Sequence, residues 1–115
     1  MPTTDKLLER MKLGNGLVIY GVNPEHAEAI AFANKVCEAV DDCPRYVISQ
    51  GLQEIDNAIT FQNFLTDIET ARSRVRKGLP FLFMVHATLE ALSGAKGNIF
   101  QDDLTIDRIC VADGL

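Results

Sequence analysis

The sequence is poor in cysteine, and its three thiols lie at irregular spacing, at Cys37, Cys43 and Cys110. An odd number of cysteines at such spacing fits neither a disulfide framework nor a zinc-binding pattern. We therefore expect no metal site and no cofactor. Reduced thiols also favour a cytoplasmic protein.

Long apolar runs are absent as well. No segment approaches the about 18 consecutive apolar residues that a membrane-spanning helix needs. The first 14 residues, MPTTDKLLERMKLG, lack the apolar region and the cleavage site of a secretory signal. The sequence therefore predicts a protein that is neither inserted into a membrane nor exported.

Basic residues are outnumbered, with 11 Lys and Arg against 16 Asp and Glu and a net charge of −5. Binding to a phosphate backbone needs a basic face, so we expect no nucleic-acid partner. One local basic cluster stands out; it comprises Arg72, Arg74, Arg76 and Lys77. Such a cluster is typical of the solvated end of a helix, where cations complement the dipole, and an anion site is the less favoured alternative.

What the sequence does contain is an alternation of strands and helices in a chain long enough for one domain, residues 1–115. Buried strands are predicted over residues 17–22, 45–49, 81–85 and 106–112. Helices are predicted over residues 24–40, 61–77 and 87–92, with a brief helix along Leu52, Ile55 and Ile59. Thr4 can cap a further helix within an N-terminal extension of residues 1–15, with Leu7, Leu8 and Met11 on one face.

This order predicts a three-layer α/β/α domain with a mainly parallel sheet of four to five strands. The strands at 17–22 and 81–85 should be central neighbours, buried on both faces. Asn23 can cap the helix that follows, and Pro24 suits its first position. Its predicted apolar face comprises Ala27, Ile30, Ala31, Ala33, Asn34, Val36, Cys37 and Val40. Cys110 should lie within a strand, and Cys43 should be the most exposed thiol.

Candidate ligand-binding residues follow two of the strands. Gly21 and Asn23 come after the first, and His86 and Thr88 come after the strand at 81–85. In open α/β sheets, ligands bind at the edge where the strands end, so we expect these residues to share a depression there. The alternative for Gly21 and Asn23 is an ordinary capped turn, because neither G-x-G-x-x-G nor a Walker lysine is present.

His86 is the one candidate catalytic residue, as a general base or a ligand. No carboxylate is adjacent to it, and Glu90, one helical turn away, is only a suggestive partner. The interpretation we favour is a buried, hydrogen-bonded histidine. His26, in the first turn of a helix, is more typical of a surface histidine.

Several segments together follow a known family pattern. A strand and an Ala-rich helix are predicted in LVIYGVNPEHAEAIAFANKVCEAV, and a second strand ends in glycine in RYVISQG. A helix then leads into a strand in RSRVRKGLPFLFMV, followed by TLEALSG, and the tail holds Asp103-Leu104 and residues 106–111. Over about residues 16–112 this order resembles the DsrE/DsrF-like family, small α/β domains associated with sulfur transfer.

The resemblance implies the family fold and a homo-oligomer, with one departure. The members that carry sulfur have a cysteine where the third strand ends, and His86 stands there in this sequence. A persulfide carrier needs that thiolate. We therefore expect a non-catalytic domain that binds a small molecule or a protein partner. The alternative is a sulfur-relay or small-molecule enzyme that uses His86 or a cysteine at another position.

Overall fold

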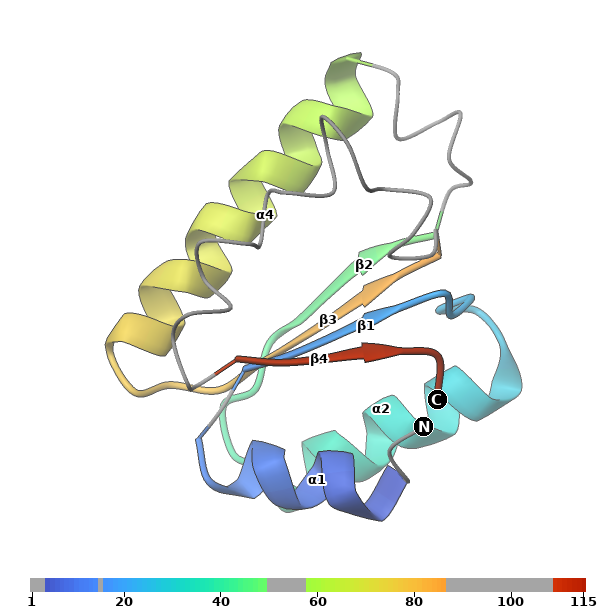
Figure 1. Ribbon diagram of the computed structural model, residues 1–115, viewed down its shortest axis with the longest axis vertical. Helices are drawn as coiled ribbons and strands as arrows, with labels where there is room; N and C mark the ends of the chain where they lie inside the picture. The colour runs from blue at the N-terminus through green and yellow to red at the C-terminus, as the bar shows by residue number, and fades with distance from the viewer. Residues whose placement is uncertain (1–3, 15, 50–57, 87–108) are drawn as a thin grey trace.

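A computed structural model describes residues 4–14, 16–49, 58–86 and 109–115 of the chain. Its elements are α1 (Thr4–Lys12), β1 (Gly16–Tyr20), α2 (Ala27–Ala39), β2 (Arg45–Ile48), α4 (Ala58–Arg76), β3 (Phe81–Val85) and β4 (Ile109–Asp113). The described strands form one parallel sheet in the order β2-β3-β1-β4. Helices α1 and α2 cover one face and α4 covers the other (Figure 1), so the predicted α/β/α layering is confirmed.

Strands β1 and β3 are adjacent and buried along their whole length, as predicted. Because side chains alternate along a strand, each of the two strands supplies both cores. Val18 and Phe83 belong to the core under α4, whereas Leu17 and Met84 belong to the core under α1 and α2. Central position in the sheet therefore explains why both runs are almost entirely apolar.

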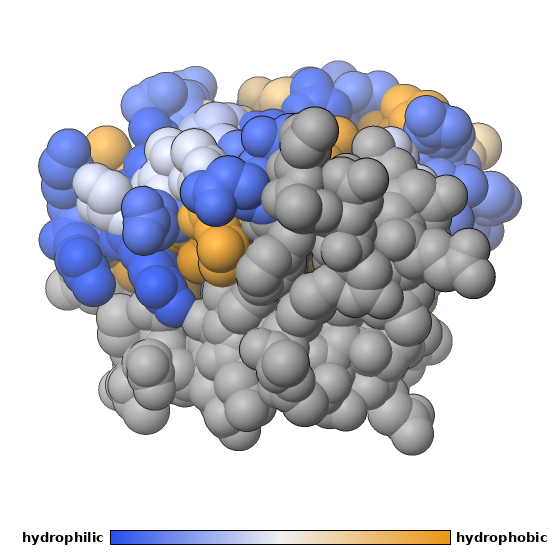
Figure 2. Space-filling view, turned by 90° about the horizontal axis from the view of Figure 1, so that it is seen from above, coloured by the Kyte–Doolittle hydropathy of each residue, from blue (hydrophilic) through white to orange (hydrophobic). Residues whose placement is uncertain are grey.

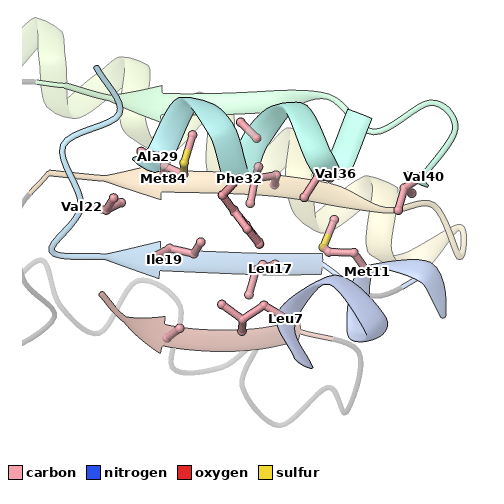
Figure 3. Packing of buried hydrophobic residues seen from close by; sticks show 13 residues of the cluster. Leu7, Met11, Leu17, Ile19, Val22, Ala29, Phe32, Val36, Val40 and Met84 are labelled. Atoms are coloured by element: carbon pink, nitrogen blue, oxygen red, sulfur yellow. The ribbon is translucent and has the colours of Figure 1, made fainter. Parts of the chain in front are cut away.

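Helix α1 is an integral part of the layer beside α2. Leu7 and Met11 point from α1 toward β1 and are 1% and 0% exposed (Figure 3). Phe32 of α2 lies in the same cluster, against Leu17 of β1. The predicted face of α1 is thus correct for its two buried members.

The buried face predicted for α2 is wrong in part. Ala33, Val36 and Val40 are buried as predicted. Ile30 is 46% exposed, and the other exposed members of the predicted face are Ala27, Ala31, Asn34 and Cys37. Phe32, which is not on the predicted apolar face, is buried instead, at 3% exposure. Helix α2 carries apolar residues around much of its circumference, so two different stripes of them repeat with the helical period. Burying the stripe that contains the large Phe32 ring removes more apolar surface from water.

The start of α2 also differs from the prediction, because its N-cap is His26 and not Asn23. Asn23 instead closes a turn: its Oδ1 accepts the backbone N–H of Glu25 at 3.0 Å, and its carbonyl accepts that of His26 at 2.9 Å. An Asn-Pro pair favours turns as well as helix starts, and here the turn comes first. His26 then has extended backbone angles, so the helix cannot begin before Ala27.

Helix α4 begins at Ala58, three residues before its predicted start, and buries Ile68, Ala71 and Val75. Seen from above (Figure 2), the described part of the surface is mostly hydrophilic, with hydrophobic atoms in separate patches. Strand β4 is described from Ile109 onward. The predicted helix at 87–92 and the stretch from Leu52 to Ile55 lie outside the described residues.

Arg74, from the basic cluster, links two loops at the amino edge of the sheet. Its Nη2 donates to the backbone carbonyl of Asp42 at 2.6 Å and lies 3.3 Å from the Asp42 carboxylate. Its Nε donates to the carbonyl of Pro80 at 3.0 Å. Arg74 is therefore structural, and with a side chain only 18% exposed it differs from the solvated helix end that the sequence predicts.

Candidate functional site

The carboxyl edge of the sheet is held together by backbone hydrogen bonds between neighbouring strand ends. The N–H of Val22 donates to the carbonyl of Val85 at 3.2 Å, and that of Gly114 donates to Tyr20 at 2.7 Å. Gly21, between them, has φ +67°, a conformation that favours glycine. Gly21 thus turns the chain sharply out of β1 toward α2.

A hollow of about 260 Å³ opens at this turn, and we refer to it as the polar hollow. Its walls come from the end of β1, the start of α2 and the last residue. The lining residues are Gly21, Val22, Asn23, His26, Glu28, Ala29 and Leu115. Two of the predicted ligand-binding residues, Gly21 and Asn23, therefore do line one depression, at the edge of the sheet where a ligand was expected.

Local hydrogen bonds orient the polar side chains of this hollow. The Oδ1 atom of Asn23 accepts the N–H of Glu25, which orients the amide and leaves its Nδ2 group as a donor outside that bond. Nδ1 of His26 accepts the N–H of Glu28 at 3.3 Å. The neutral imidazole therefore carries its proton on Nε2, which is also a donor. The hollow offers donors from Asn23 and His26 and an acceptor from the Glu28 carboxylate.

His86 follows β3 directly, as predicted, but it is exposed, so the expectation of a buried histidine is wrong. Its Nδ1 lies 2.9 Å from the carbonyl oxygen of Ser49, which follows β2. Because a carbonyl only accepts, Nδ1 carries the proton, and Nε2 presents its lone pair.

The structure does not bring His86 together with Gly21 and Asn23. Its ring is bonded on the β2 side of β3, whereas the polar hollow lies beside β1, on the other side of β3. The fourth candidate, Thr88, lies outside the described residues. Sequence reasoning missed His26 and Glu28 as lining residues, although their place in the first turn after β1 was a usable signal.

A second hollow, of about 250 Å³, lies beside the first, and we refer to it as the apolar hollow. It is lined by Thr4, Glu28, Ala31, Phe32, Lys35 and Leu115. Glu28 and Leu115 line both hollows. Lys35 lies two helical turns from Glu28, about 10 Å along α2 at 1.5 Å per residue.

The cysteines lie away from this edge. Cys43 lies between α2 and β2 at the amino edge, and Cys110 is the second residue of β4. Burial, and after it the nearby Cys37 thiol, raise the pKa of the Cys43 thiol to about 11, against the lowering effects of Arg74 and Arg45. Cys43 is therefore protonated at neutral pH and a poor nucleophile. It is half-buried, so the prediction that it is the most exposed thiol is wrong; Cys37 is exposed.

Within the described ranges, no three His, Cys, Asp or Glu side chains form a group that could hold a metal ion. In the same part of the chain, no helix is both long and apolar enough to cross a membrane. Comparisons of the chain with protein-family models, with curated proteins and with solved structures find no match. The features of the molecule that bear on function are therefore the two hollows and the side chains that line them.

Proposed function

We propose that the chain is a non-catalytic, DsrE/DsrF-like domain that binds a small ligand in the polar hollow. The observation that carries this proposal is the hollow itself, at the carboxyl end of β1, with the donors of Asn23 and His26 oriented by the backbone. Side chains already held in place lose less conformational freedom when a ligand binds. The family resemblance supports the fold, and His86 in place of the sulfur-carrier cysteine supports a non-catalytic role.

The two histidines of the chain provide a matched test. His26→Ser keeps an N-cap acceptor for α2 while removing the Nε2 donor from the polar hollow. His86→Ser removes the other exposed imidazole, outside the hollow. We expect a polar fragment found by ¹⁵N NMR screening to shift the amides of residues 21–29. His26→Ser should weaken its binding about tenfold, the loss of one hydrogen bond, and His86→Ser should leave it unchanged. The opposite pattern would contradict the proposal.

A second candidate function is catalysis or sulfur relay through His86 or a cysteine. The exposed Nε2 of His86, with its tautomer set by Ser49, favours it, because that arrangement suits a general base. Incubation with a persulfide donor followed by intact-mass measurement separates the two functions. Gain of one sulfur that disappears when a single cysteine is replaced would support the relay and contradict a purely binding role.

Self-association as a homo-oligomer completes the proposal and follows from the family resemblance. Light scattering at micromolar concentration tests the self-association directly. A mass near the 12.7 kDa of one chain would contradict this part of the proposal and leave the ligand site untouched.

A further inference from the structure

The polar and apolar hollows adjoin along α2, and together we refer to them as the groove. Glu28 and Leu115 line both of them, so the two hollows meet at these two side chains. The polar part ends at Asn23 and the apolar part ends at Lys35. Glu28, Ala31 and Lys35 are spaced by three and four residues, so the apolar part follows one flank of α2, and it meets the polar part at Glu28.

The polar and apolar parts of the groove bind different chemical groups of a ligand. Asn23 and His26 present donors and therefore need an acceptor on the ligand, such as a carbonyl oxygen. Glu28 needs a donor and repels an anionic head group. Ala31, Phe32 and Leu115 supply an apolar floor. A neutral group that both accepts and donates hydrogen bonds, joined to an apolar chain, therefore matches the polar and the apolar part of the groove.

We infer that the groove binds a neutral amphiphile, a primary amide or a similar carbonyl-and-N–H group, with its apolar chain lying along α2 beside Phe32. This inference rests on the proposed function and specifies its ligand class. The amide oxygen lies toward Asn23 and His26, and the amide N–H lies toward Glu28. Lys35 borders the far end and disfavours a cationic tail.

Chain length provides the first test, with propanamide and hexanamide as probes in ¹⁵N NMR titrations of the full chain. Each buried methylene contributes about fourfold in affinity when fully covered. In this open groove we expect hexanamide to bind at least tenfold more tightly than propanamide. Hexanamide should shift the amides of both Asn23 and Ala31, and propanamide only those of the polar part.

Two substitutions test the two parts separately. Ala31→Asp places a charge on the apolar floor at an exposed helix position and should abolish the advantage of hexanamide over propanamide. Ala39→Asp, at an exposed position on the same helix but outside the groove, is the matched control and should preserve that advantage. Glu28→Gln should increase binding of hexanoate about tenfold or more, because the carboxylate that repels it is gone.

The outcomes distinguish the two levels of the proposal. Equal affinities for propanamide and hexanamide, with shifts confined to residues 21–29, would overturn the amphiphile inference and leave the proposed site intact. If Ala31→Asp binds hexanamide with the same affinity as the wild type, the amphiphile inference is overturned as well. If neither amide shifts any residue of the polar hollow, the inference fails, and the fragment screen together with His26→Ser then decides whether the proposed function fails with it.

Discussion

Replacing Gly16 with alanine should destabilise the protein through a single steric contact. Gly16 is the first residue of β1, paired with Phe81 of β3, and the ring of Phe81 covers it. An ideal Cβ at Gly16 would lie 2.6 Å from Cζ and 2.7 Å from Cδ1 of that ring, and closer still to Cε1. Phe81 is 0% exposed, so its ring can move aside only by displacing other close-packed atoms of the core.

The size of the effect follows from two opposed terms. Overpacking a well-packed core costs about 1–3 kcal/mol. Alanine offsets roughly 0.5–1 kcal/mol of this by reducing the freedom of the unfolded chain. With an unfolding entropy of about 2.1 cal/mol/K per residue, a net loss of about 1–2 kcal/mol lowers the Tm of 115 residues by roughly 4–8 °C.

A double-mutant cycle with Phe81→Leu isolates the contact. In the Phe81→Leu background, Gly16→Ala should cost at least 1 kcal/mol less than in the wild type, measured by urea unfolding. Gly78→Ala is the control: Gly78 has φ +74° and nothing within 4 Å of an added Cβ, so its cost is conformational and independent of Phe81. Equal costs for Gly16→Ala in both backgrounds, or a higher Tm for Gly16→Ala alone, would refute the reasoning.

Three further predictions concern other parts of the chain. His86→Ala should cost no more than about 1 kcal/mol in urea unfolding, because the hydrogen bond to Ser49 is exposed; a loss above 2 kcal/mol would mean that the imidazole is buried. Arg74→Met should cost about 2 kcal/mol, since two loop carbonyls lose a charged donor, and an unchanged Tm would contradict the structural role of this side chain. The pKa of the Cys43 thiol, raised from 9.0 to about 11, predicts that its alkylation lags behind that of Cys37 at pH 8 and accelerates up to about pH 11; equal rates at pH 8 would contradict this.

The sheet could be predicted from the sequence because its signal is strong and local. The run at Phe81–Val85 is apolar at every position, which only a strand buried on both faces explains, and the structure has the same bounds. The face of α2 could not be predicted in the same way. Ile30 and Phe32 both fit a helical stripe, and the choice between them depends on which stripe meets β1 and α1, a tertiary contact absent from any local pattern.

The candidate site residues show the same difference between what a local pattern predicts and what depends on tertiary contacts. Gly21 and Asn23 follow from the rule that ligands bind where parallel strands end. The separation of His86 from them does not, because it depends on which neighbouring strand the imidazole meets. Here that neighbour is Ser49 after β2, and the strand order that places β2 beside β3 follows from the crossovers of the whole chain.

The position of β1 in the sheet has a consequence for synthesis on the ribosome. It precedes the other strands in the chain, yet its two neighbours are β3 and β4, the last ones described. The roughly 65 residues from Tyr20 to Val85 take about 3–13 s to emerge at about 5–20 residues per second. During that interval α1 and α2 can cover the face of β1 that carries Leu17 and Ile19, through Leu7, Met11 and Phe32. On this face, α1 and α2 can therefore bury part of an apolar strand before its two neighbours in the sheet are synthesised.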